Sequence, residues 1–175
     1  MTPEEIRVRA AYLFLACSQA VERLKNRLTA TVPSATAASV RLVLERALRR
    51  ELGLLFRYWT TRQIWARLEA NEEDAKQLNL VLLRLFTEAF KLPRDGSGLR
   101  YAEMSTVAEE ASELSHRITN ILGMVHQPLL NELQGAILPW RDAVIKYTTD
   151  ALELPLDQLA SSVKEWAAQG PEPLT

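Results

Sequence analysis

Hydrophobic residues recur at steps of three or four along almost the whole chain, which is the spacing of one buried helix face. The first such run begins after Thr2, a candidate N-cap, with Pro3 in the first turn, and it continues to about Thr29. Its apolar positions are Ile6, Ala10, Leu13, Cys17, Ala20, Val21, Leu24 and Leu28. The segment TATVPS then interrupts the pattern, and Pro33 within it predicts a turn.

Two further helices are predicted before the middle of the chain. The second is capped by Ser34 and runs from about Ala35 to Leu68, where an apolar stripe with aromatic residues continues over many turns. The third is capped by Asn71, has acidic residues in its first turn, and extends to about Leu92. Because the apolar phase resets at Asn71, the pattern favours a turn between two helices over one continuous rod.

A loop and a long fourth helix are predicted next. The segment LPRDGSG, residues 92–98, combines proline and two glycines and therefore predicts a loop. A fourth helix starts near Tyr101 and carries the apolar positions Met104, Val107, Ala111, Leu114, Ile118, Ile121, Leu122 and Val125. Pro128 lacks an amide proton and clashes with the carbonyl of Met124, so a kink or break is expected there.

The remaining residues predict two shorter helices and a tail. A fifth helix begins with LPW at residues 138–140 and ends near Ala151, and a sixth opens at Pro155 and ends at Gly170. Residues 171–175 are expected to form a disordered tail. No strand-like alternation or fixed repeat is found in the sequence. We therefore predict an all-α fold, an antiparallel bundle of about five or six helices in a single domain over residues 1–170.

Charge and cysteine content restrict the classes of function. The 175 residues carry a net charge of −1, so no overall charge attracts the protein to nucleic acid or to an anionic membrane. Cys17 is the single cysteine and cannot form an internal disulfide bond. Glu4 and Glu5 argue against an export signal at the first apolar run, and no window approaches the ~18 apolar residues of a membrane span. We expect a cytoplasmic protein.

Arginines concentrate on the predicted second helix among aromatic residues, a pattern that can bind phosphates and stack on bases. The candidates for such a surface are Arg46, Arg49, Arg50 and Arg57. Acidic partners are available elsewhere in the chain, at Glu72, Glu73, Asp74, Glu103, Glu109, Glu110 and Glu113. Because the net charge is near zero, pairing with these acids is favoured, and nucleic-acid binding remains a second alternative function.

The two histidines do not predict a metal site. Glu113 and His116 are one helical turn apart, which is the spacing in di-iron helical bundles. Such a centre needs a second Glu-x-x-His motif, and His126 has Gly123 three residues before it. His126 precedes Pro128 in an uncharged stretch and is expected to bond a carbonyl freed by the kink. The sequence therefore predicts no metal and no cofactor.

The stretch ELSHRITNIL, residues 113–122, carries a local resemblance to a known family. It resembles the phospho-acceptor helix of HWE-type sensor histidine kinases, which reads roughly E-L-x-H-R-V-x-N-x-L. The residues that match are Glu113, Leu114, His116, Arg117, Ile118, Asn120 and Leu122, while Thr119 replaces the usual lysine. The resemblance covers about ten of the 175 residues.

This resemblance implies that His116 is the phosphorylated nucleophile, on a helix of a dimer interface. Glu113 would orient the imidazole ring or accept its proton, and Arg117 and Asn120 would contact the phosphoryl oxygens. The complementary helix face is apolar, so His116 is expected to face solvent. About fifty residues follow His126, and they contain no glycine-rich ATP-binding loop. The alternative function is therefore a phosphotransfer protein or a degenerate histidine-kinase dimerisation protein.

The function that the sequence favours is non-enzymatic. Large aromatic residues are more numerous than a thin bundle can easily bury, and tryptophan, tyrosine and arginine commonly anchor protein interfaces. The interface candidates are Tyr58, Trp59, Trp65, Trp140 and Trp166. We therefore expect a helical protein–protein interaction module that self-associates as a homodimer.

Overall fold

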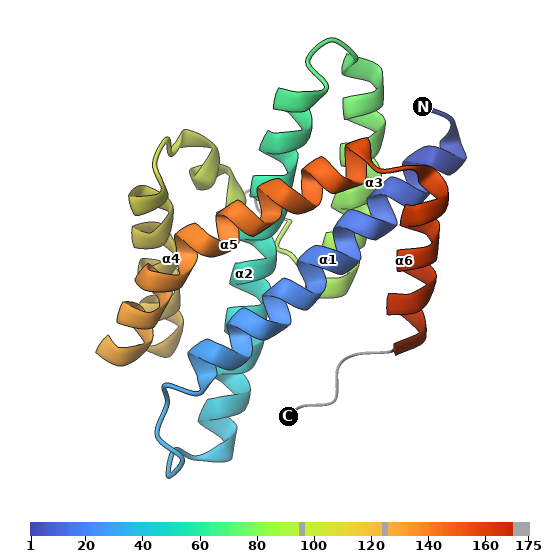
Figure 1. Ribbon diagram of the computed structural model, residues 1–175. Helices are drawn as coiled ribbons and strands as arrows, with labels where there is room; N and C mark the ends of the chain where they lie inside the picture. Colours follow the sequence, from blue (N-terminus) through green and yellow to red (C-terminus); the bar gives the residue numbers. More distant parts are fainter. Residues whose placement is uncertain (95–96, 124–125, 170–175) are drawn as a thin grey trace.

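The computed structural model describes residues 1–94, 97–123 and 126–169, and no side chain at 97–99. In this part of the chain every regular element is helical, and the predicted all-α bundle is confirmed (Figure 1). The elements are α1 (Pro3–Thr29), α2 (Ala38–Arg67), α3 (Glu72–Phe90), the 3-10 helix η1 (Ser97–Glu103), α4 (Val107–Leu122), α5 (Gln127–Glu153) and α6 (Leu156–Gln169). The predicted tail at 171–175 and the predicted helix end at Gly170 lie outside the described residues.

Helix α1 is the central element of the bundle. It packs against α2, α3, α5 and α6, and α5 runs antiparallel beside it (Figure 1). No charged side chain occurs from Ala10 to Val21, so this part of α1 can be covered by neighbours on several sides without burying a charge. Leu13, Leu24 and Leu28 are fully buried. Each such side chain contributes about 1.5–3 kcal/mol relative to exposure.

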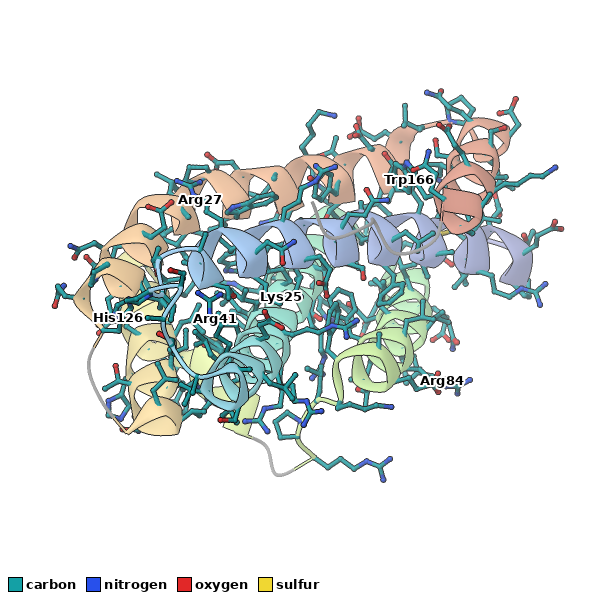
Figure 2. The ribbon with its side chains drawn as sticks, turned by 90° about the horizontal axis from the view of Figure 1, so that it is seen from below. Lys25, Arg27, Arg41, Arg84, His126 and Trp166 are labelled. Atoms are coloured by element: carbon teal, nitrogen blue, oxygen red, sulfur yellow. The ribbon has the colours of Figure 1, made fainter. Side chains whose placement is uncertain are left out.

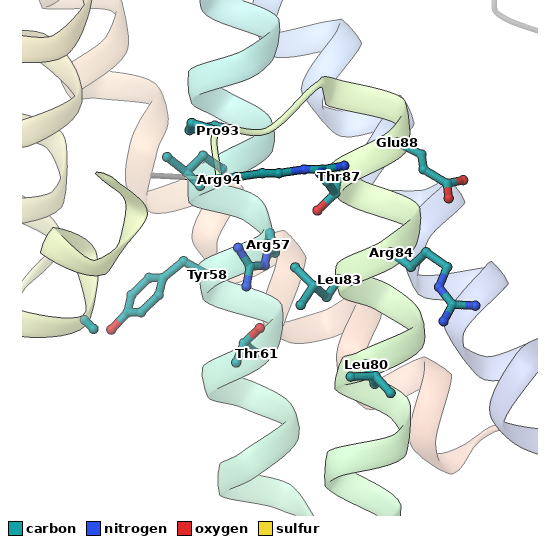
Figure 3. Close-up of a pocket in the computed structure, with 12 residues that line it drawn as sticks. Arg57, Tyr58, Thr61, Leu80, Leu83, Arg84, Thr87, Glu88, Pro93 and Arg94 are labelled. Carbon is teal, nitrogen blue, oxygen red and sulfur yellow. The ribbon is translucent and has the colours of Figure 1, made fainter. Parts of the chain in front are cut away.

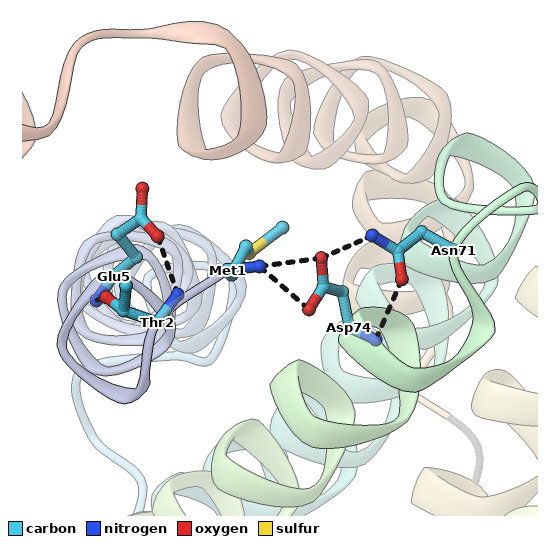
Figure 4. Close-up of polar contacts among 5 residues, drawn as sticks. All are labelled: Met1, Thr2, Glu5, Asn71 and Asp74. Atoms are coloured by element: carbon cyan, nitrogen blue, oxygen red, sulfur yellow. Dashed lines mark hydrogen bonds and ion pairs between the residues drawn. The ribbon is translucent and has the colours of Figure 1, made fainter.

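The start of α1 is tied to the start of α3 by polar contacts (Figure 4). Thr2 and Glu5 form the capping box of α1, with the Thr2 amide 2.6 Å from the Glu5 carboxylate. The amino group of Met1 lies 3.0 Å from both carboxylate oxygens of Asp74. Asn71 caps α3 as predicted, and its side-chain amide also donates to Asp74. The turn predicted between the second and third helices is confirmed.

The predicted start of the second helix is wrong by three residues. Helix α2 begins at Ala38, and no side chain caps its first turn, so Ser34 is not the N-cap. The guanidinium of Arg41 instead reaches back and donates to the carbonyls of Val32 and Pro33, at 3.0 Å each. Through this contact a side chain of α2 holds the preceding turn in place. The local sequence pattern does not reveal this contact.

The fourth helix also starts later than predicted. Tyr101 belongs to η1 and is fully buried, whereas α4 begins at Val107. Thr106 and Glu109 form a capping box at this point, a signal of helix initiation that outweighs the apolar residues before it. The break expected near Pro128 is confirmed. Helix α4 ends before Gly123, which has a left-handed φ of 67°, and residues 124 and 125 lie outside the described part.

The prediction that a fifth helix begins at residue 138 is wrong. Helix α5 runs unbroken through this segment, with Pro128 in its first turn and Pro139 in its interior. Proline at 139 removes the bond to the carbonyl of Gly135. Both Gly135 and Pro139 are exposed, so water can satisfy that carbonyl, and the helix tolerates the proline. Over the residues described, no helix has both the length and the apolar character of a membrane span.

Candidate functional site

Two of the four candidate nucleic-acid arginines are paired with carboxylates. Arg49 lies 2.8 Å from the carboxylate of Glu22 and stacks over a phenylalanine ring. Arg50 lies 3.5 Å from Glu51 on its own helix. Arg46 is exposed on the same helix. Ion pairs therefore neutralise Arg49 and Arg50, whereas Arg46 has no ion pair among the described residues.

Arg57 has a different environment, because it lies in a groove between α2, α3 and residues 93, 94 and 102 of the connection from α3 to α4 (Figure 3). The groove has a volume of about 780 Å³. Its lining residues are Leu54, Arg57, Tyr58 and Thr61 of α2; Leu80, Leu83, Arg84, Thr87 and Glu88 of α3; and Pro93, Arg94 and Ala102 of the connection. The lining therefore includes three arginines and one glutamate among mostly apolar and neutral residues.

The guanidinium of Arg57 is partly removed from water without an acidic partner. Burial lowers its pKa, and no carboxylate forms an ion pair with it among the residues that the structure describes. Arg84 and Arg94 also lack an ion pair within the described ranges. Arg94 points across the space between α2 and α3 toward Thr87 (Figure 3). The groove therefore holds positive charge that the described chain leaves unneutralised.

Two threonine hydroxyls on the groove wall are available as hydrogen-bond donors. Thr60 and Thr148 use their hydroxyls to bond carbonyls of their own helices, at 2.7 and 2.9 Å. No such bond is found for the side chains of Thr61 and Thr87 in the described part of the chain, and both line the groove. A hydroxyl can donate to an anion and accept from a neighbouring guanidinium at the same time.

The apolar part of the groove includes two leucines with large exposed areas. Leu80 is 53% exposed and Leu83 is 36% exposed, and they lie one turn apart on α3. The core face of α3 is formed by other positions, including Leu78, Leu82 and Phe86. This second leucine pair, outside the core stripe, is the sequence signal for the groove. The helical periodicity of the core positions does not reveal it.

The residues of the proposed phospho-acceptor motif separate into two groups. Glu113 is 9% exposed and faces α2 with Arg117, whose Nε donates to it at 3.0 Å and whose Nη1 donates to Glu51 at 3.4 Å. His116 is exposed as expected, and its Nε2 lies 3.1 Å from the side-chain amide of Asn120. The structure therefore places His116 beside Asn120 and engages the other two residues in the contact between α4 and α2.

Most of the aromatic interface candidates contribute to the interior. Trp59 is 2% exposed and donates from its indole nitrogen to Glu110 at 2.7 Å, so it presents no surface to a partner. Trp140 and Trp166 are half-buried, and Trp166 packs on Tyr12 with ring centroids 5.0 Å apart. The bundle therefore buries, wholly or in part, these three of the five aromatic residues that were expected at an interface.

The remaining two candidates reach the surface in different places. Tyr58 lines the groove and stacks with Tyr101, with ring centroids 6.1 Å apart. Trp65 is 40% exposed near the end of α2. Of the five aromatic candidates, Tyr58 is therefore the one that belongs to the groove.

His126 performs a structural task. Its Nε2 lies 3.2 Å from the carbonyl of Thr31, so it joins the turn after α1 to the start of α5. Figure 2 shows His126 and Arg41 at the same end of the molecule, where both hold this turn. The bonded carbonyl belongs to that turn and not to the segment before Pro128. Within the described residues, no group of three or more histidine, cysteine, aspartate or glutamate side chains could hold a metal ion.

Comparison of the chain with known protein families, curated proteins and solved structures found no match.

Proposed function

We propose that this protein is a non-enzymatic interaction module and that the groove between α2 and α3 docks a segment of a partner protein with acidic and aliphatic side chains. The single observation that supports this proposal most strongly is Arg57, which is half-buried in the groove without a carboxylate partner in the described chain. A partly desolvated cation is stabilised when an anion joins it.

The apolar surface of the groove supports a docked helix over a small polar ligand. Leu80 and Leu83 are exposed one turn apart, and an amphipathic helix places its own aliphatic residues at matching spacing. Covering one leucine side chain contributes up to about 1.5–3 kcal/mol. The arginines at the rim would select an acidic segment and reject a basic one by charge complementarity.

The proposal can be tested with a labelled, capped helical peptide of leucine, alanine and glutamate, and with the same peptide carrying lysine in place of glutamate. Fluorescence anisotropy with the full chain should show binding of the acidic peptide alone. The variant Leu80→Asn should weaken binding about tenfold, because it removes apolar contact in the groove. Leu138→Asn is the matched control, since Leu138 is 51% exposed on α5, outside the groove.

Two results would contradict the docking proposal. One is equal binding of the acidic and basic peptides, and the other is an equal effect of the Leu80→Asn and Leu138→Asn substitutions. Light scattering on the same samples tests the proposed self-association. If the protein is a dimer and Leu80→Asn dissociates it, the occupant of the groove is a second copy of this chain and not a separate partner.

A further inference from the structure

Arg57 differs from Arg117, another partly buried arginine of the bundle, in its counter-charges. Arg117 lies between the carboxylates of Glu113 and Glu51, at 3.0 and 3.4 Å. Arg57 has no equivalent carboxylate in the described part of the chain, although burial lowers its pKa. A guanidinium stays protonated at any physiological pH, so the positive charge remains in the groove. Arg57 can therefore donate to an anion that enters the groove.

The donors around Arg57 come from three separate segments. Arg94 of the connection points toward Thr87 of α3, and the Thr61 hydroxyl lies on the same helix as Arg57, one turn further along (Figure 3). A guanidinium presents its donors as a planar fork that matches the two oxygens of a carboxylate. The hydroxyl of Thr87 can also donate to a carboxylate oxygen.

We propose that Arg57 and Arg94, with the hydroxyl of Thr87, form a subsite for one carboxylate group of the docked segment. This assignment rests on the proposed docking function, because the carboxylate is taken to belong to a glutamate or aspartate of the partner. Leu83 and Pro93 line the groove beside these donors and suit the aliphatic stem of such a side chain.

The composition of the groove favours a carboxylate over a phosphate group. Glu88 also lines the groove, and its negative charge opposes the second charge of a phosphate dianion. A dianion also costs more to remove from water into a partly apolar groove than a single carboxylate does. A phosphorylated segment is therefore the competing ligand that the experiment must separate.

The subsite can be tested with three probes of equal chain length: hexanoate, hexanol and hexyl phosphate. Each is titrated into the full-length protein labelled with nitrogen-15, and the arginine Nε–H signals are followed by NMR. We expect hexanoate to shift the Arg57 signal and to bind at least about tenfold more tightly than hexanol, as a charge-assisted hydrogen bond predicts. Equal binding of hexanoate and hexanol, or tighter binding of hexyl phosphate, would overturn the assignment.

Two substitutions and one control test whether the binding advantage of hexanoate depends on the arginines of the groove. Arg57→Gln should abolish the advantage of hexanoate over hexanol. Arg94→Gln should reduce this advantage, and because Arg94 is exposed, this substitution should leave the fold intact. Arg46→Gln removes an exposed arginine of α2 outside the groove and should leave the advantage unchanged. An effect of Arg46→Gln equal to that of Arg94→Gln would indicate general charge attraction and overturn the subsite.

The peptide assay separates failure of the subsite from failure of the docking function. If hexanoate binds through Arg57 but the acidic peptide does not bind, the docking function is wrong and the groove is a site for small carboxylates. If the acidic peptide binds through Leu80, yet replacing its glutamates with glutamine costs nothing, the docking function stands. In that case the carboxylate subsite is overturned.

Discussion

Replacing Gly53 with alanine tests how closely α2 and α3 approach beneath the groove. Gly53 lies in the interior of α2 opposite Phe90, the last residue of α3. A Cβ atom at position 53 would lie 2.6 Å from Cγ and 2.8 Å from Cβ of Phe90. Rotation of the Phe90 ring cannot remove the contact with its Cβ, because that atom is attached to the backbone. The end of α3 must therefore move.

Two opposing effects determine the change in stability. Alanine is favoured over glycine in a helix interior by about 1 kcal/mol. Forcing an extra carbon into a packed contact costs about 1–3 kcal/mol. Phe90 is followed by Lys91, which closes α3 with a left-handed φ of 52°. We expect the packing cost to exceed the gain, so that Gly53→Ala lowers the free energy of unfolding by up to about 2 kcal/mol.

Gly135 provides a matched control for the same substitution. It lies inside α5, and a Cβ built there meets no atom within 4 Å. Gly135→Ala should therefore raise the free energy of unfolding by about 0.5–1 kcal/mol. Urea unfolding followed by circular dichroism measures both variants. If Gly53→Ala also stabilises the protein, the close packing of α3 against α2 is wrong.

Three further predictions concern buried and exposed polar groups. Trp59→Phe removes the indole donor that lies 2.7 Å from the buried carboxylate of Glu110, and it should lower the free energy of unfolding by about 1–3 kcal/mol in a urea titration. A change below about 0.5 kcal/mol would show that this bond contributes little. Burial raises the pKa of the Cys17 thiol and of the Tyr101 hydroxyl above their ordinary values of 9.0 and 10.0. The unfolded chain therefore loses these protons first as pH rises. Stability should fall above about pH 9 through Cys17 and above about pH 10 through Tyr101, by up to about 1.4 kcal/mol per pH unit for each group. Cys17→Ala should reduce this slope in urea titrations between about pH 8 and about pH 11, and an unchanged slope would contradict the assignment. For His116, we expect no acid-labile phosphorylation by phosphoramidate, because Glu113 and Arg117 are engaged with each other and the His116 Nε2 accepts from the side-chain amide of Asn120. A label that His116→Ala abolishes would instead support phosphotransfer.

The caps and apolar stripes that define single helices were predictable from the sequence. Thr2 and Asn71 cap α1 and α3 as predicted, because a cap depends on residues within one turn of the helix start. The periodicity predicted α1 with both ends correct, and Gly123 with Pro128 marked a real break. These signals are local, so the chain carries them before any helix packs on another.

Contacts that reach beyond one helical turn decided the rest. Pro139 remains inside a helix because packing places it on the solvent side of α5, and Arg41 replaces a cap by bonding the preceding turn. The sequence by itself determined an all-α chain, both ends of α1 and the cap of α3. Only the tertiary structure decided that Arg49 meets Glu22, whereas Arg57 faces an open groove. The physical reason is that an ion pair depends on which helix lies opposite, and helical periodicity contains no information about that neighbour.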